Sequence, residues 1–345
     1  MTASTAIVLA SRPHGEPTLS DFRLETRPVR PLRDGEVLLR TIYLSLDPYM
    51  RGRMNAAKSY AAAVELGEVM EAGTVSEVIH TRHPDLAPGD VVLSRNGWQT
   101  HAVAPGAGLR RLDPAAAPLS AHLGLLGMPG FAAYIGVEEI GRPQQGETFV
   151  VAAATGAVGG AAGQFAKLRG ARVVGIAGGA RKVEWMASEG GFDVALDHRS
   201  ATFADDLAAA VPDGVDVYFE NVGGAVWDAV FPHLNDFARV PLCGLVSQYN
   251  RTEPPAGPDR LPELMTAINI KRMTVRGFTQ RDFVDTLSER FQRDVSRWWG
   301  EGRLRYLEDV VDGIENAPEA FLGMLRGENF GKLVVRVGPE PSPRR

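Results

Sequence analysis

Two patterns of hydrophobic positions divide the chain. Between about Thr5 and Leu112, short apolar runs are broken by glycine and proline, which is typical of an antiparallel β-rich domain with irregular loops. Beyond Met128, apolar runs of strand length alternate with segments of helical period, which is the pattern of βαβ units. The sequence therefore predicts an α/β protein, in which a doubly wound parallel sheet is joined to a β-rich domain.

The second pattern is regular enough to predict its elements individually. The expected strands cover residues 148–152, 172–177, 194–197, 215–221, 239–244 and 273–277, with helices at 160–170, 181–189, 201–210, 225–234 and 261–269. A further helix is expected over 282–299, because Phe283, Leu287, Phe291, Val295 and Trp299 recur at every fourth position of a charged stretch. In the first pattern, strands are expected at 6–10, 36–46, 73–79 and 90–93, and an isolated one follows at 332–337.

Composition narrows the class of protein. The chain has 345 residues, 44% of them hydrophobic and 23% charged, which suits about two globular domains. The net charge is -5 and no basic stripe with aromatics occurs, so nucleic acid is not an expected partner, and no run suits a membrane span. The single cysteine, Cys243, excludes an intrachain disulfide and agrees with a cytoplasmic location.

The strongest local signal is a glycine-rich turn between an expected strand and an expected helix. The run FVVAAATGAVGGAAG (149–163) places Ala154, Gly156 and Gly159 at the three key positions of the dinucleotide-binding fingerprint, with alanine replacing the first glycine. Gly156 lets the backbone approach a pyrophosphate, and Gly159 lets the helix pack closely on the strand. The helix N-terminus supplies N–H groups, so the turn predicts a dinucleotide site.

The residues after the second strand of this domain distinguish between cofactors. A carboxylate there would accept a hydrogen bond from a free ribose 2′-hydroxyl, whereas a 2′-phosphate requires cations. No carboxylate occurs between Val173 and Glu184, and Arg181 and Lys182 stand where a phosphate would bind, which favours NADP(H) over NAD(H). His198, after the third strand, could add a donor to that phosphate or be an ordinary surface histidine.

A metal site is not expected. Of the seven histidines only His80 and His83 lie close in sequence, and Cys243 is far from both. A catalytic zinc needs three protein ligands and a structural zinc usually four, so metal-dependent alcohol oxidation has no basis here. The sequence also lacks a G-x-S-x-G motif and a cysteine with a nearby histidine for nucleophilic catalysis.

Seven blocks carry a more specific resemblance. They are LSLDPYMRGRM (44–54), GMPGFAAY (127–134), AATGAVGGAAGQFAKLRG (153–170), YFENVGG (218–224), PLCGLVSQYN (241–250), RGF (276–278) and GENFGKLVVRV (327–337). In this order they resemble the medium-chain dehydrogenase/reductase superfamily, and more narrowly its zinc-free branch of NADPH-dependent double-bond reductases. The blocks span nearly the whole chain, which makes the resemblance far more specific than one glycine motif.

The resemblance implies a domain plan. A GroES-like substrate domain would cover residues 1–127 and be completed by 302–337, and a Rossmann NADP-binding domain would cover 128–301. Residues 338–345, with three prolines in VGPEPSPRR nearby, would form a flexible tail. The family also implies a small-molecule substrate and a homodimer.

The resemblance further implies site residues. The expected cofactor-binding residues are Thr155, Gly156, Ala157, Val158, Gly159, Gly178, Lys182, His198, Asn221, Cys243, Gly244, Ser247, Tyr249, Phe278, Thr279 and Asn329. Of these, residues 156–159 would line the pyrophosphate, Lys182 would meet the 2′-phosphate, and Tyr249 would also lie beside the substrate carbonyl as the catalytic residue. Asp47, Tyr49, Met50 and Arg51 match the loop at the mouth of the substrate pocket. His198 stands where mammalian members usually carry a tyrosine.

These residues also have structural interpretations. Asn221 and Asn329 lie near glycines and could be turn residues, and Cys243 could be a buried strand thiol. Tyr49 and Tyr249 could be packed aromatic residues with a satisfied hydroxyl group.

The implied activity is reduction of the C=C bond of an α,β-unsaturated ketone or aldehyde. NADPH would deliver hydride to the β-carbon, and hydrogen-bond donors such as Tyr249 would stabilise the enolate oxygen. Quinone reduction, with the same cofactor and fold, and a non-catalytic NADPH-binding protein remain alternatives. The pocket walls come from loops such as 55–64 and 251–260, so the sequence does not choose among enone substrates.

Overall fold

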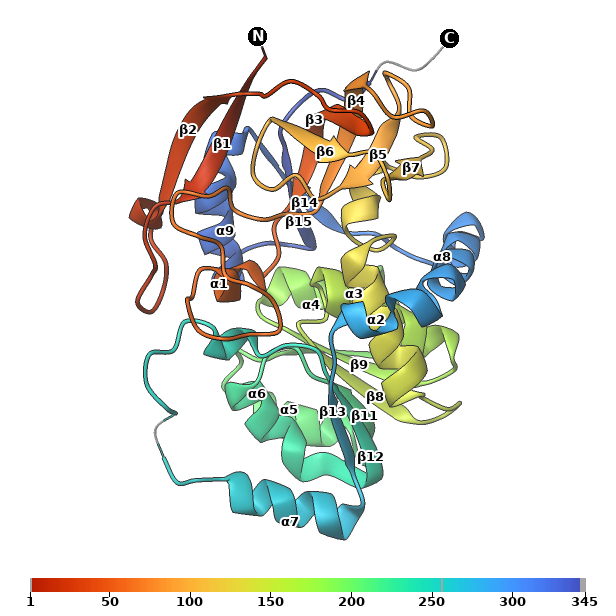
Figure 1. Cartoon of the computed structure of the whole chain (residues 1–345). Helices are drawn as coiled ribbons and strands as arrows, with labels where there is room; N and C mark the ends of the chain where they lie inside the picture. Colours follow the sequence, from red (N-terminus) through yellow and green to blue (C-terminus); the bar gives the residue numbers. More distant parts are fainter. Residues whose placement is uncertain (1, 256, 342–345) are drawn as a thin grey trace. The chain divides into compact units, whose positions relative to one another are not determined.

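The computed structural model describes residues 2–255 and 257–341 of the chain (Figure 1). The chain divides into two compact units. Unit 1 is formed by Met1–Gly124 together with Glu308–Arg345, and unit 2 by Leu125–Leu307.

Unit 1 is built on two sheets whose strands pair antiparallel, except for one parallel pair. Its elements are β1 (Ala3–Leu9), η1 (Leu19–Asp21), β2 (Phe22–Pro28), β3 (Glu36–Ser45), α1 (Met50–Arg53), β4 (Thr74–Thr81), β5 (Val91–Ser94), β6 (His101–Pro105), β7 (Arg110–Leu112), η2 (Leu119–Leu123), β14 (Glu308–Asp312), η7 (Ile314–Asn316), α9 (Ala317–Leu325) and β15 (Lys332–Arg336). The main sheet has the order β14-β15-β3-β4-β5-β7, in which β14 and β15 form the parallel pair, and β6 also pairs with β3. β15 runs antiparallel to β3 and aligns Val334 with Ser45, so the last strand of the chain lies beside an early one.

Aromatic residues from distant segments form the core of unit 1. The fully buried ring of Trp98 stacks on Phe22 with centroids 5.7 Å apart, and the Phe321 ring meets Trp98 edge-on at 5.6 Å. Such pairs contribute about 0.5–1.5 kcal/mol beyond the area they bury. Helix α9 near the end of the chain is therefore part of the same core as β2.

The described part of the C-terminal segment is hydrogen-bonded to β3. Arg40 donates to the carbonyl oxygen of Pro339 at 2.9 Å, and the Tyr43 hydroxyl donates to Glu340 at 2.7 Å. Residues 342–345 of the expected flexible tail lie outside the described residues.

Unit 2 confirms the predicted doubly wound sheet. Its elements are α2 (Met128–Ile135), the π-helical turn η3 (Gly136–Gly141), β8 (Thr148–Ala152), α3 (Ala157–Leu168), β9 (Arg172–Ala177), α4 (Ala180–Ser188), β10 (Val194–Asp197), α5 (Phe203–Ala210), β11 (Val215–Phe219), α6 (Gly224–Val230), η4 (Phe231–His233), β12 (Leu234–Leu242), η5 (Val246–Gln248), α7 (Leu261–Lys271), β13 (Thr274–Gly277), η6 (Gln280–Phe283) and α8 (Val284–Gly300). The strand order is β10-β9-β8-β11-β12-β13, and all neighbouring strands are parallel. Successive strands are added on one side of β8 up to β10 and on its other side from β11 onwards, so the switch point lies between β8 and β11. Ligands of such sheets bind outside the carboxyl ends of the strands at this switch point.

Both faces of the sheet in unit 2 are covered. On one face Val150 and Ala152 of β8 belong to a core with residues of α5, α6 and α7. On the other face, α3 packs on β8 and β9, α2 packs on α3, and α8 packs on α2 (Figure 1). All five residues of β8 are buried, as expected for a central parallel strand.

The buried stripe of α8 differs from the expected one at its end. Leu287, Phe291 and Val295 are buried as predicted, but the buried tryptophan is Trp298 and not Trp299. Trp298 packs against the Phe165 ring at 5.5 Å. A strict four-residue repeat drifts around a helix with 3.6 residues per turn, so the stripe returns to the core by a step of three. None of the helices in the described residues, α8 included, is long and apolar enough to cross a membrane.

A substitution at Gly159 tests how closely α3 must approach β8. A Cβ atom at this position would lie 2.3 Å from the carbonyl oxygen of Ala153 and 2.9 Å from that of Ala152. We therefore expect Gly159→Ala to lower the free energy of unfolding by about 1–3 kcal/mol, measured by urea denaturation. Gly300→Ala is the control, because a Cβ atom there meets nothing within 4 Å. Equal stability of the two variants would contradict the close approach.

Candidate functional site

The turn after β8 leads directly into the first helix of the sheet. Ala153 has a φ of 53°, which is unusual for a residue other than glycine, and its carbonyl oxygen accepts the N–H of Gly156 at 2.9 Å. Gly156 is the N-cap of α3 and has no side chain with which to cap it. The N–H groups of Ala157, Val158 and Gly159 open the helix, where backbone donors lack intrahelical acceptors and attract anions.

Two side chains from the end of β10 cover the end of β9. A Cβ atom on Gly178 would lie 2.7 Å from both the Nε2 atom of His198 and the Nε atom of Arg199. Both residues are exposed, and Lys182 lies in the first turn of α4. Partial desolvation and the charge of Arg199 lower the pKa of His198, which favours a neutral ring at pH 7. Gly178, His198, Arg199 and Lys182 thus form one corner of the sheet edge, which brings the predicted residues His198 and Lys182 together with Arg199.

Asp197 fixes the backbone of the same corner. Its Oδ1 atom accepts the N–H of Gly179 at 3.0 Å and that of Arg199 at 2.8 Å. Although desolvation acts in the opposite direction, these two donors hold the pKa of Asp197 below its ordinary value. The carboxylate therefore stays ionised at neutral pH and connects the loops that follow β9 and β10.

The loops after β11 and β12 are bonded to each other and to β8. The Asn221 side chain donates to the carbonyl oxygen of Ala152 at 2.9 Å, which links the end of β11 to the end of β8, where the glycine-rich turn begins. The N–H of Val246 donates to Asn221 at 3.1 Å, and that of Ser247 donates to Val222 at 3.0 Å. These bonds bring the segments 220–224 and 243–249 together at the carboxyl edge of the sheet.

Tyr249 lies over the start of this second loop. A Cβ atom on Gly244 would lie 3.1 Å from the Tyr249 hydroxyl oxygen and 3.6 Å from the carbonyl oxygen of Asn221. Cys243, next to it, is half-buried, and desolvation raises the pKa of its thiol to about 12, so the thiol stays protonated. The structure thus brings Asn221, Gly244 and Tyr249 together.

Phe278 and Thr279 follow β13, at the same edge of the sheet. Thr279 caps the short helix η6 and forms a capping box with Asp282. The structure describes both residues in this turn, and Phe278 is half-buried.

The predicted pocket residues of unit 1 lie in and around α1. Met50 is fully buried in the core, and the buried guanidinium of Arg51 donates to Gly15 and Asn55 at 2.7 Å each. Both side chains therefore hold the loop in place. Asp47 is 6% exposed and accepts bonds from Ser45 and, at 3.2 Å, from the buried Lys332.

Tyr49 is the accessible member of this loop. Its residue is half-buried, and the Arg53 guanidinium lies 5.6 Å from its ring centroid. Desolvation and the charge of Asp47 raise the pKa of the Tyr49 hydroxyl, so it remains protonated. Arg53 also lies 4.5 Å from the ring of the exposed Tyr60, which connects Tyr49 to the loop 55–64.

Asn329 belongs to unit 1 as well. Its side chain donates to the carbonyl oxygen of Gly331 at 2.8 Å, within the turn that precedes β15. This bond agrees with the interpretation of Asn329 as a turn residue.

The described residues contain no cluster of side chains that could bind a metal ion. Across residues 2–255 and 257–341, no group of three or more His, Cys, Asp or Glu side chains is arranged so that it could hold a metal ion. The most buried histidine, His122 in η2, has no hydrogen-bond partner for either ring nitrogen within the described chain.

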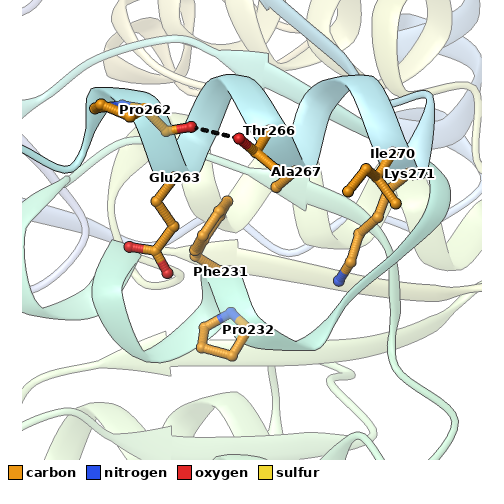
Figure 2. Close-up of a pocket in the computed structure, with 8 residues that line it drawn as sticks. All are labelled: Phe231, Pro232, Pro262, Glu263, Thr266, Ala267, Ile270 and Lys271. Atoms are coloured by element: carbon orange, nitrogen blue, oxygen red, sulfur yellow. Dashed lines mark hydrogen bonds between the residues drawn. The ribbon is translucent and has the colours of Figure 1, made fainter.

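A pocket of unit 2 lies away from the predicted residues. It is formed between η4 and α7, near the amino ends of β12 and β13, and Figure 2 shows its lining: Phe231, Pro232, Pro262, Glu263, Thr266, Ala267, Ile270 and Lys271. Lys271 is already bonded to the carbonyl oxygen of Leu234 at 2.6 Å. None of the residues predicted for the site lines this pocket.

Sequence reasoning missed two residues of the site in unit 2. Arg199 directly follows His198, so its position after the third strand could have identified it as a second candidate for the 2′-phosphate. Glu220 stands inside the block YFENVGG, and its buried carboxylate accepts N–H bonds from Val222 and Gly223. A carboxylate that bonds its own loop leaves no distinct sequence pattern.

Comparisons with known proteins agree with this geometry. Residues 5–112 match the family model described as the N-terminal domain of oxidoreductase, and residues 157–298 match that described as zinc-binding dehydrogenase. The chain is 53% identical over 331 residues to the NADPH-dependent curcumin reductase of Escherichia coli, covering 96% of each. It is 40% identical over 326 residues to prostaglandin reductase 1 of Bos taurus, covering 93% of this chain and 95% of the relative. Among solved structures, CurA from Vibrio vulnificus in complex with NADPH is similar with a TM-score of 0.94 and 49% identity, covering 97% of this chain and 99% of that one.

Because His122 is buried and its ring nitrogens have no hydrogen-bond partner among the described residues, we expect the stability of the protein to depend on pH. Desolvation, reinforced by Arg110, lowers its pKa to about 4, whereas an unfolded histidine titrates near 6.5. The unfolded chain therefore binds more protons than the folded one below about pH 6.5. We expect His122 to remove about 3 kcal/mol of unfolding free energy as the pH falls from 6.5 to 4.

Urea denaturation across this pH range measures the effect. His122→Leu should abolish this part of the pH dependence, while His80→Leu, which changes an exposed histidine of the same unit, should keep it. Parallel pH profiles for the wild type and His122→Leu would contradict the assignment.

Proposed function

Because the chain belongs to the medium-chain dehydrogenase/reductase superfamily, in the branch of double-bond reductases that contains curcumin reductase and prostaglandin reductase, we propose that it reduces the C=C bond of α,β-unsaturated ketones and aldehydes with NADPH. Identity over nearly the whole chain supports the reaction class. The observation that carries the proposal on this chain is the hydroxyl of Tyr249 over Gly244, at the edge of the sheet where dinucleotides bind.

Several features of unit 2 fit NADPH. Gly156, the N-cap of α3, has no side chain to stand between the backbone and a pyrophosphate, and the open end of α3 offers its N–H groups. The corner at Gly178 presents Arg199, His198 and Lys182, which suit a 2′-phosphate. Thr155, Asn221, Cys243, Gly244, Ser247, Phe278 and Thr279 would contact the rest of the cofactor.

The proposed roles of the protein side chains follow from where negative charge develops on the substrate during hydride transfer. Bound NADPH supplies a hydride to the β-carbon of the enone. Negative charge then builds on the carbonyl oxygen of the substrate, and the Tyr249 hydroxyl donates a hydrogen bond to it. The α-carbon then takes up a proton. Tyr249 must therefore be held at a fixed position relative to the cofactor pocket.

We assign the substrate-binding part to unit 1. The loop that carries Tyr49 is anchored by Asp47, Met50 and Arg51, so Tyr49 can present a fixed surface to a substrate. Asn329 would close over the nicotinamide half of the cofactor. The segment 1–127 with 302–337 would serve as the GroES-like domain, and 128–301 as the NADP-binding domain.

We propose that the reaction needs no metal, that the protein is cytoplasmic, and that it works as a homodimer. The scattered histidines and the single Cys243 support the first two points.

The edge strand β13 and the exposed Leu261, Met265 and Ile270 of α7 support a contact with a second copy. Sedimentation equilibrium should give about twice the chain mass of 37.2 kDa, and a monomer would contradict the homodimer.

The direct test is the loss of NADPH absorbance at 340 nm with a panel of enones, alkenals and quinones. Each assay is repeated with NADH and with excess EDTA. We expect NADPH-dependent, EDTA-insensitive turnover with the saturated ketone as product. A strong preference for quinones would identify a quinone reductase, and NADPH binding without turnover on the panel would identify a binding protein.

Tyr249→Phe removes the proposed donor and keeps the ring. We expect kcat to fall by roughly 10- to 1000-fold, the range for one lost donor to a developing oxyanion, with NADPH affinity preserved. Tyr43→Phe, which loses a hydroxyl that bonds Glu340 in unit 1, is the control and should retain kcat. Unchanged turnover of Tyr249→Phe would remove Tyr249 from the mechanism.

Arg199→Ala tests the corner at Gly178. A charged hydrogen bond contributes about 1.5–3 kcal/mol, so NADPH affinity should fall at least about tenfold while NADH affinity changes little. Arg293→Ala, at a mostly exposed position of α8, controls for the loss of one positive charge. Equal losses for both cofactors, measured by fluorescence titration, would exclude contact between Arg199 and the 2′-phosphate.

A further inference from the structure

Glu220 is a fully buried carboxylate in the middle of the site. It follows β11 and is 0% exposed. Its Oε1 atom accepts the N–H groups of Val222 at 2.5 Å and Gly223 at 2.9 Å, and its Oε2 atom accepts the hydroxyl of the buried Tyr218 at 3.1 Å. A buried carboxylate is costly unless it is bonded, and here both oxygens have donors.

These bonds determine the shape of the loop after β11. Gly223 and Gly224 have φ angles of 74° and 58°, so the backbone turns sharply there. The turn directs the N–H groups of Val222 and Gly223 back to one oxygen atom, and it leaves the carbonyl oxygens of Asn221 and Val222 available for the next loop. Burial raises the pKa of Glu220 and the N–H groups of Val222 and Gly223 act against this rise, so the two bonds that converge on one oxygen atom anchor the turn.

The next loop is fastened to those two carbonyl oxygens. Asn221 accepts the N–H of Val246 at 3.1 Å, and Val222 accepts both the N–H of Ser247 at 3.0 Å and its hydroxyl at 2.6 Å. Tyr249 follows at once, and its N–H donates to Val246 at 3.3 Å. The residues that carry Tyr249 are therefore held by the turn that Glu220 anchors.

The main chain of Glu220 holds the other end of the same loop. Its carbonyl oxygen accepts the N–H of Cys243 at 3.0 Å and that of Gly244 at 3.3 Å. The Tyr249 hydroxyl lies over Gly244. One residue thus bonds directly to Gly244 and, through the turn 221–223, to the segment that leads to Tyr249.

We infer that Glu220 is a positioning residue that fixes the Tyr249 hydroxyl over Gly244. This inference rests on the proposed function only for its kinetic consequence. In the absence of the carboxylate, the N–H groups of Val222 and Gly223 lose their acceptor, and the segment 243–249 loses the frame to which it is bonded. Tyr249 then samples positions in which its hydroxyl does not meet the substrate oxygen.

Three variants and a control separate positioning from stability alone. Glu220→Ala removes both acceptors, and Glu220→Gln keeps an amide oxygen of the same reach. Asp216→Ala is the matched control at the opposite end of β11, because Asp216 accepts the N–H of Thr148 and the Asn235 amide, each at 2.8 Å, at the amino end of this strand. Glu220→Asp draws the acceptor back by one bond and replaces Glu220→Ala if that variant does not fold.

Hydrogen exchange of the ligand-free protein tests the positioning without turnover. We expect peptides that cover residues 243–250 to exchange at least tenfold faster in Glu220→Ala than in the wild type. Glu220→Gln and Asp216→Ala should leave their exchange close to that of the wild type. Unchanged exchange in Glu220→Ala, or the same increase in Asp216→Ala, overturns the inference.

Kinetics test the link to Tyr249. Glu220→Ala should lower kcat at least tenfold, and Glu220→Gln should restore most of kcat. In the Tyr249→Phe background, Glu220→Ala should change kcat less than threefold, because residues that act through one group are not additive. Additive losses overturn the inference. A wild type that does not reduce enones would refute the proposed function instead, and the exchange experiment would still decide the role of Glu220.

Discussion

The first turn of the parallel sheet depends on a contact that only a glycine permits. At Gly159 the helix α3 lies so close to the end of β8 that a Cβ atom would overlap two backbone carbonyl groups. This approach lets the chain leave β8 and enter α3 within a few residues, with Ala153 in a left-handed conformation. The open helix end is consequently held at the switch point of the sheet, where β8 and β11 are neighbours.

Hydrogen bonds from polar groups hold the other proposed site loops of unit 2 at this edge of the sheet. Asn221 links β11 to the last carbonyl of β8, Glu220 holds the turn that follows, and that turn holds the segment with Tyr249. Asp197 connects the neighbouring loops in the same way. Unit 1 uses a similar device, since the buried Lys332 donates to Asp47 and to the carbonyl oxygen of Leu46. Rigid strands and short polar bonds together give loops a fixed geometry, which catalysis requires.

The sequence predicts the regular parts of this structure well, because periodicity reports burial. The six strands of unit 2 lie where apolar runs predict them, but β12 begins at Leu234, before its apolar run. The polar residues of β12 fall at an irregularity in its pairing with β11, where Val215 and Val217 face Leu234 and Arg239. The tryptophan of α8 that packs inside is Trp298, because side-chain direction depends on helical phase rather than on a simple repeat. Arg199 and Glu220 carry no periodic signal at all, since contacts across strands depend on register.

In the proposed reaction, this chain directs a hydride to a carbon–carbon double bond and not to the carbonyl carbon. The most direct measurement is the reduction of an enone with NADPH deuterated at the transferring carbon, followed by NMR of the product. We expect one deuterium on the β-carbon and a solvent-derived hydrogen on the α-carbon, with the carbonyl group intact. Deuterium on the former carbonyl carbon, with an allylic alcohol as product, would contradict the proposed reaction.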